Sequence, residues 1–342
     1  MTEAGVAAAS DALTIGRGTF RQRAVARLFA GASRLACLLP ERPLIALADL
    51  AGRVWYRASP ASAALARANL RRVCTWLAAE GLGSERARRA ATDPAALERL
   101  VRAAFRHRAR YYLEVARLPA MDQAYVRKRI VVETPETIDR IFGSGRPVVF
   151  VGAHFGSIEL PGVYLAARTG RTPVAPMETL ADPELQRYFV RTRGAIGVRI
   201  VTLRAARREL LAGLKRGDPV GIIGDRDISG GGIAVPLFGT PAPLPIGPAL
   251  LALESDATIC VAGIRRTEPG RYAGGVEEVS VPAEGTRRER VTTTMHRLAA
   301  AFETLIADAP DQWWAVFFPI WPDLEAEAGG AGGGPGARAV AA

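Results

Sequence analysis

The feature that most limits the fold of this chain is a change of pattern at Arg129. From there on, short runs rich in Val and Ile alternate with segments whose apolar residues recur at helical spacing. Such alternation is typical of an α/β protein, in which helices cover a sheet. The expected strands are 129–134, 147–153, 172–177, 198–203, 219–225, 257–264 and 273–281. The expected helices are 136–142, 157–168, 182–194, 205–216, 247–255 and 287–307.

The segment before Arg129 has helical periodicity only. Four stretches, 28–39, 41–59, 60–81 and 93–119, each combine an apolar stripe with an arginine-bearing face. We therefore predict a central mixed sheet flanked by helices, preceded by an N-terminal amphipathic helical region. The predicted divisions are a disordered 1–20, a membrane-docking helical region 21–128, an α/β catalytic domain 129–324 and a disordered Gly/Ala-rich tail 325–342.

The net charge of +11 indicates an anionic partner. Lys128 and Lys215 are the only lysines, so nearly all of the positive charge is arginine, which binds phosphate and carboxylate bidentately. Apolar stripes beside arginines are typical of helices that lie at an anionic membrane surface. An ordinary solvated basic face on a helical subdomain is the alternative interpretation. The most apolar early stretch, 28–51, is interrupted by charges and a proline, so we expect no transmembrane span there.

Targeting and cysteine usage favour a cytoplasmic location. The N-terminus lacks the pattern of a secretory signal peptide. Cys37, Cys74 and Cys260 are far apart in the sequence and form no metal or redox motif, which fits a reducing compartment. We expect no metal and no cofactor.

His154 is the strongest candidate for chemistry. It follows the apolar run 147–153 and precedes a predicted helix, so it lies at the carboxyl end of a strand, where ligands bind in open α/β sheets. Gly152 and Gly156 flank it and permit a sharp turn. The first amides of a helix beginning near Ser157 would be free to meet an anionic substrate.

Three carboxylates are candidates to orient the imidazole of His154. Glu159 is five residues later and reaches the histidine only if the latter is on the turn outside the helix. Asp225 and Asp227 follow another predicted strand and can converge on the same edge, unless they merely form a turn. A histidine paired with a carboxylate is a general base able to take a proton from an alcohol.

An acyl-enzyme mechanism has little support in the sequence. There is no G-x-S-x-G motif around any serine, and Ser157 lacks that context. The glycines at 230–232 are not followed by the residues of a phosphate-binding loop. We therefore favour direct attack by an acceptor hydroxyl on an acyl donor.

Four segments in order resemble the bacterial lipid A biosynthesis lauroyl and myristoyl acyltransferases, together with the actinobacterial phosphatidylinositol mannoside acyltransferases. They are VGAHFGSIEL, with the H-x4-D/E motif, then PMETLADPELQRYFVRTRGAIGV, IIGDRDISGGGIAVPLFGTPAPLPIGPALLA and PDQWWAVFFPIWPDL. The resemblance covers roughly residues 21–324, and the DRD run and tryptophan-rich ending look closer to the mannoside branch. The ending also differs from the mannoside pattern, which leaves the acceptor open.

The resemblance implies a glycerolipid-acyltransferase-like fold and the roles of several residues. His154 is implied as catalytic base and Glu159 as its motif carboxylate, with Asp225 or Asp227 completing the relay. Glu178 and Arg193 are implied as active-site residues, and we add Ser157 and Arg226 as substrate contacts. The implied donor is acyl-CoA or acyl-carrier protein, and the implied acceptor is a glycolipid hydroxyl at the inner face of the plasma membrane.

Other functions remain as alternatives. A lipid A-type or other glycerolipid acyltransferase would use the same residues on a different acceptor. A lipid hydrolase would use water in place of the hydroxyl. A non-catalytic protein that binds anionic lipid or nucleic acid through its arginines would need no role for His154, and the concentration of polar residues at strand ends argues against it. We expect no nucleic-acid partner.

Overall fold

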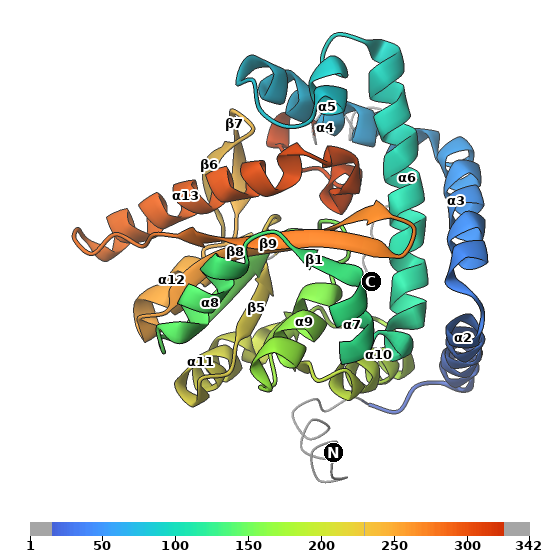
Figure 1. Ribbon diagram of the computed structural model, residues 1–342, viewed down its shortest axis with the longest axis horizontal. Coiled ribbons are helices and arrows are strands. Elements are labelled where there is room, and N and C mark those ends of the chain that lie inside the picture. The colour runs from blue at the N-terminus through green and yellow to red at the C-terminus, as the bar shows by residue number, and fades with distance from the viewer. Residues whose placement is uncertain (1–15, 229, 325–342) are drawn as a thin grey trace.

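The computed structural model describes residues 16–228 and 230–324. An N-terminal set of helices stands against one side of a helix-covered sheet (Figure 1). These helices are α2 (Phe20–Leu38), α3 (Glu41–Ala58), α4 (Pro60–Ala79), α5 (Glu85–Arg89), α6 (Pro94–Arg117) and α7 (Gln123–Arg129), with a 3-10 turn at Leu118–Ala120. The helical pattern predicted for 21–119 is thus confirmed. The predicted tail 325–342 and most of 1–20 lie outside the described residues.

Local sequence explains where the long helices begin. Thr19 and Gln22 form a reciprocal capping box at the start of α2. Asp93 accepts hydrogen bonds from the amides of Ala95 and Ala96, and Pro94 occupies the first position of α6, where its missing N–H costs nothing. Residue types that favour helix starts therefore stand at both places.

All seven predicted strands are present in one sheet. Its order is β1-β9-β8-β2-β5-β3-β4, and all neighbouring pairs are parallel except β8 with β9. The strands are β1 (Ile130–Val132), β2 (Val148–Gly152), β3 (Val174–Met177), β4 (Arg199–Thr202), β5 (Val220–Ile223), β8 (Thr258–Glu268) and β9 (Arg271–Val279). This is the predicted mixed α/β sheet.

Helices cover both faces of the sheet, as Figure 1 shows. They are α8 (Pro135–Gly143), α9 (Leu160–Thr169), α10 (Pro183–Ala195), α11 (Ala206–Arg216), α12 (Gly247–Ser255) and α13 (Arg287–Ala307). Alternate residues of β2 serve the two faces, because side chains along a strand point to opposite sides. Val149 and Val151 join the core that contains α12 and α13, whereas Phe150 packs in a separate cluster with Ile141 and Leu165.

A two-stranded antiparallel hairpin, β6 (Ile233–Leu237) and β7 (Thr240–Leu244), was not predicted. Three prolines in it argue against a strand in an ordinary sheet, since proline cannot donate to the ladder. A two-stranded ribbon tolerates them on its unpaired sides. Phe238 and Gly239 form the turn with positive φ, and Phe238 is buried beneath it.

The N-terminal helices share the main core with the sheet. Leu70 of α4 and Phe105 of α6 belong to the same buried cluster as Val151 of β2 and Phe302 of α13. The boundary at 128/129 stays a prediction, and it falls within the last turn of α7. Described helices include none with the length and apolar content needed to cross a bilayer.

Candidate active site

The strand order brings two of the candidate residues together. β2 pairs with β5 in parallel, with Val151 opposite Ile222 and Gly152 opposite Ile223. The chain leaves both strands at the same edge, so His154 and Asp225 follow neighbouring strand ends. This is the carboxyl edge at which α/β proteins bind ligands.

His154 and Asp225 make a two-point contact. The Nδ1 of His154 is 2.7 Å from Oδ1 of Asp225, and the backbone amide of His154 donates to Oδ2 at 2.9 Å. The indole Nε1–H of Trp313 donates to the same Oδ2 at 2.7 Å. Asp225 is fully buried and the imidazole is partly exposed. In the tautomer whose Nδ1–H donates to this carboxylate, the Nε2 lone pair is available to accept a proton.

The electrostatics favour an ionised Asp225. Burial by itself would raise the pKa of this carboxyl, but the nearby imidazole and the hydrogen bonds from His154 and Trp313 outweigh it. The pKa of Asp225 therefore lies below its ordinary value. A carboxylate that stays charged is suited to stabilise an imidazolium.

The turn that carries His154 is fixed from two sides. The carbonyl of His154 accepts a hydrogen bond from the amide of Trp314 at 2.6 Å, and the amide of Gly156 donates to the carbonyl of Gln312 at 2.9 Å. Gly156 has a φ of 56°, and a Cβ there would lie 2.0 Å from the carbonyl oxygen of Ile264. Only glycine fits this close approach, which explains its place two residues after the histidine.

Glu159 is engaged elsewhere in this structure. Its carboxylate binds the guanidinium of Arg193 in a fork, with Nε of Arg193 donating to Oε2 at 2.9 Å and a second bond from Nη2. Both side chains are nearly buried. The resemblance paired Glu159 with His154, whereas the imidazole is hydrogen-bonded to Asp225. Glu159 and Arg193, two predicted site residues, are instead brought together with each other.

The predicted helix start near Ser157 is wrong. Helix α9 begins at Leu160, and the amide of Ser157 donates to the carbonyl of Ile264 at 2.9 Å, so this amide is not free for an anion. The turn is instead drawn against strand β8 by that bond. Ser157 is fully buried, and its Oγ has no hydrogen-bond partner within the described ranges.

Asp227 shapes the loop that follows Asp225. Its carboxylate accepts from the amides of Gly230 at 3.1 Å and Gly232 at 2.7 Å. These bonds agree with the turn-forming role that we considered as an alternative for Asp227. Of the two aspartates in the DRD run, Asp225 is the one hydrogen-bonded to His154.

Arg226 and Glu178 interact through their charges. The guanidinium of Arg226 lies 3.8 Å from the ring centre of Phe318, and burial lowers the pKa of Arg226 while the carboxylates of Asp225 and Glu178 oppose that shift. Glu178 directly follows β3, two strands from β2 in the sheet. Both residues therefore belong to the same sheet edge as His154.

Aromatic side chains lie beside the imidazole of His154. Trp314 lies with its ring centre 5.1 Å from that of His154, and Tyr111 of α6 lies 5.4 Å from Trp314 on another side. Tyr111 was not predicted, because nothing in the sequence links α6 to a site 43 residues later. The hydrogen bond from Trp313 to Asp225 was not predicted either, although a buried indole N–H needs a partner.

Comparison with known proteins gives the family. The model of the bacterial lipid A biosynthesis acyltransferases matches residues 19–318. A phosphatidylinositol mannoside acyltransferase of Mycolicibacterium smegmatis is 33% identical over 228 residues, covering 65% of this chain and 72% of that protein. A protein of the same name from Mycobacterium tuberculosis is 30% identical over 188 residues, covering 53% of this chain and 59% of the relative.

These matches confirm the resemblance drawn from the four sequence segments. The matched range includes the N-terminal helices, the sheet and the turn of His154. The chain belongs to the bacterial lipid A biosynthesis acyltransferase family and is an acyltransferase.

Proposed function

We propose that this protein transfers a fatty acyl chain from acyl-CoA or acyl-carrier protein to a hydroxyl of a glycolipid, a phosphatidylinositol mannoside, with His154 as general base. The observation that carries the proposal is the hydrogen-bonded series from Trp313 through Asp225 to His154 at the carboxyl edge of the sheet. The acceptor class comes from the mycobacterial relatives, whose names refer to this glycolipid.

The proposed step needs no enzyme-bound acyl group. The acceptor oxygen attacks the thioester carbonyl carbon while Nε2 of His154 takes the hydroxyl proton. The tetrahedral intermediate then collapses, its C–S bond breaks, and the thiol leaves with the proton returned by the imidazolium. During this step Asp225 stabilises the imidazolium through its hydrogen bond with Nδ1 of His154. The acyl donor serves as co-substrate, with no further cofactor.

Five polar residues are proposed as substrate contacts and not as bases. The Glu159–Arg193 ion pair lies near the sheet edge of His154, and Arg226 and Glu178 lie at it, so two guanidiniums are placed for an anionic or hydroxyl-rich headgroup. Ser157 contributes a buried hydroxyl without a described partner.

The N-terminal helices provide a surface for peripheral membrane attachment. Large apolar side chains stand exposed along α2 and α3, among them Leu28 at 75% and Leu38 at 84%. Exposed apolar patches of this kind mark sites of association, and arginines accompany them. We propose that this surface docks on the inner face of the plasma membrane.

The test is acyl transfer from palmitoyl-CoA by wild type and His154→Ala, offered phosphatidylinositol mannosides, phospholipids and lipid A precursors in parallel. We expect labelled mannoside, and a loss of about 10²–10⁴-fold in the variant with an unchanged circular dichroism spectrum. Free fatty acid formed at the full rate without any acceptor would show a hydrolase instead. Should no acceptor be labelled, the same panel with acyl-carrier-protein donors decides, and failure there would sink the transferase proposal.

A further inference from the structure

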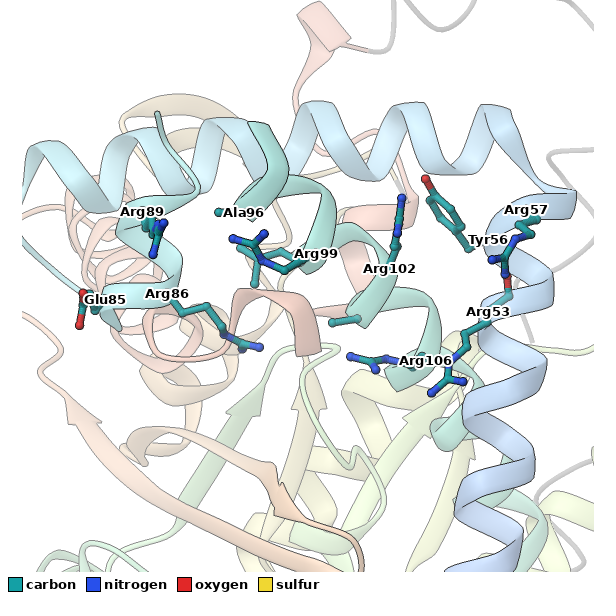
Figure 2. Close-up of a pocket in the computed structure, with 12 residues that line it drawn as sticks. Arg53, Tyr56, Arg57, Glu85, Arg86, Arg89, Ala96, Arg99, Arg102 and Arg106 are labelled. Atoms are coloured by element: carbon teal, nitrogen blue, oxygen red, sulfur yellow. The ribbon is translucent and has the colours of Figure 1, made fainter. Parts of the chain in front are cut away.

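A second concentration of charge lies away from His154. A cavity of about 750 Å³ opens between α3, α5 and α6. Figure 2 shows arginine side chains from these helices directed toward the same space. Its arginines are Arg53, Arg57, Arg86, Arg89, Arg99, Arg102 and Arg106, and we call it the arginine cavity. Glu85 is the single carboxylate among the lining residues.

Several of these arginines lie within ion-pair distance of acidic residues. Arg86 binds the buried carboxylate of Asp311 at 2.6 Å, and Arg102 lies 3.9 Å from Glu98. Arg89 and Arg99 share Asp93, at 3.4 Å and 3.5 Å. In residues 16–228 and 230–324, no carboxylate lies within ion-pair distance of Arg53, Arg57 or Arg106. The cavity thus carries positive charge that the described protein leaves unbalanced.

Positive charge also acts on His107, which follows Arg106 in α6. Burial lowers the pKa of His107 well below the ordinary value, together with the guanidiniums of Arg266 and Arg110 outside the cavity and of Arg106 and Arg86, which line it. Like charges held together cost free energy unless a bound anion offsets them. Guanidinium groups bind phosphate oxygens through two parallel hydrogen bonds, so a phosphate ligand fits this chemistry.

The position of the cavity favours a lipid as the source of that phosphate. Helix α3 exposes Leu47, Leu50 and Val54 along one stripe. At about 100° per residue, Arg57 lies only about 20° around the helix axis from Leu50, and Arg53 about 60° from it. The arginines that enter the cavity therefore border the apolar stripe. A lipid whose chains meet the stripe would present its headgroup to these arginines.

We propose that the arginine cavity binds the phosphate-bearing headgroup of an anionic membrane phospholipid, at a site separate from His154. The two sites share no lining residue among those described here, although α6 carries both Arg106 and Tyr111. The bound lipid fixes the orientation of α3 and α6 at the membrane. The inference does not depend on the reaction catalysed at His154.

The first test measures binding of the full-length protein to phosphatidylcholine vesicles with and without phosphatidylinositol, in the absence of any acyl donor. The variant Arg53→Gln/Arg57→Gln/Arg106→Gln should lose the phosphatidylinositol-dependent binding by at least about tenfold, since each cation near an anionic surface contributes about 1 kcal/mol. The matched control is Arg127→Gln/Arg204→Gln/Arg288→Gln, which removes three exposed arginines elsewhere. It should bind within about twofold of wild type. Equal losses in both variants would mean diffuse attraction and overturn the proposal.

The second test distinguishes a built site from charge alone and names the source of the phosphate. Glycerophosphoinositol, the headgroup without its chains, should compete with the vesicles for wild type. Arg53→Lys/Arg57→Lys/Arg106→Lys keeps the charge but loses the bidentate geometry, so competition should weaken severalfold even if the Gln variant fails to fold. Competition by free coenzyme A in preference to glycerophosphoinositol would assign the cavity to a nucleotide and refute the lipid assignment.

Discussion

The proposed active site around His154 and the arginine cavity differ in how their charged groups are paired. Around His154, two largely buried carboxylates have defined hydrogen-bond partners: Asp225 has the imidazole and an indole N–H, and Glu159 has Arg193. In the cavity, no carboxylate of the described residues lies within ion-pair distance of Arg53, Arg57 or Arg106, although Arg106 attracts Asp311 from farther away. The first arrangement holds the imidazole in one position, as the proposed proton transfer requires. The second favours a ligand that arrives with its own negative charge.

The difference also concerns rigidity. The His154 turn is held by backbone hydrogen bonds from Trp314 and to Gln312, on a strand at the centre of the sheet. The cavity is formed by long side chains on three helices, which adapt to an incoming group. A comparison of variants in the two regions should therefore show opposite effects on stability and activity.

Neutralising Asp225 should have the largest effect. In Asp225→Asn the amide no longer favours the Nδ1–H tautomer or the imidazolium, so we expect transfer to fall by about 10³–10⁴-fold, mainly in kcat. The matched control is Asp227→Asn, two residues away in the loop, which should lose less than about tenfold by the same reasoning. Steady-state kinetics on both variants checks this. Similar losses in the two would mean that the hydrogen bond to His154 does not give Asp225 a special role.

Breaking the ion pair between Glu159 and Arg193 should lower the free energy of unfolding. Glu159→Ala leaves the guanidinium of Arg193 nearly buried without its carboxylate, which typically costs about 3–5 kcal/mol. The measurement is urea unfolding, with Glu85→Ala in the arginine cavity as a solvent-facing comparison expected to change by less than about 1 kcal/mol. If Glu159→Ala unfolds like wild type but loses activity, Glu159 acts in chemistry and not in holding Arg193.

Removing arginines that lack an ion-pair partner should change the free energy of unfolding in the opposite direction. Arg53→Gln/Arg57→Gln/Arg106→Gln should leave the free energy of unfolding unchanged or raise it by up to about 1 kcal/mol, because repulsion is relieved. Glycerophosphoinositol should raise the Tm of wild type and not that of the variant, since only a ligand that binds the folded state stabilises it. A variant destabilised by several kcal/mol would show that these arginines serve packing.

The smallest expected effect concerns Glu303, a half-buried acid that accepts a hydrogen bond from the amide of Phe238 and has no guanidinium partner among the described residues. Burial raises its pKa to about 6. The folded state therefore holds this proton more tightly than the unfolded state, and stability falls as pH rises from about 4.3 toward 6. Glu303→Gln should remove this part of the pH dependence, roughly 1 kcal/mol or less after solvent screening. Identical pH profiles of unfolding would contradict it.

Much of the architecture followed from residue pattern. The positions of seven strands and the helices at 247–255 and 287–307 were predicted from apolar periodicity, and His154 from its place after an apolar strand. The β6–β7 hairpin was missed because prolines at its unpaired positions resemble a loop. The predicted start of α9 was too early because the chain after Gly156 first contacts strand β8. There the Ser157 amide donates to the carbonyl of Ile264, which lies 107 residues later in the sequence.

The sequence by itself determined that a histidine stands on a turn at a strand end, because local periodicity and glycine spacing are properties of neighbouring residues. Only the tertiary structure decided which carboxylate serves it. That choice depends on β5 lying beside β2 and on Trp313 reaching Asp225 from the C-terminal segment. It likewise decided that arginines from three helices face one cavity (Figure 2). Strand order and helix packing arise from contacts between distant residues, and no local pattern encodes them.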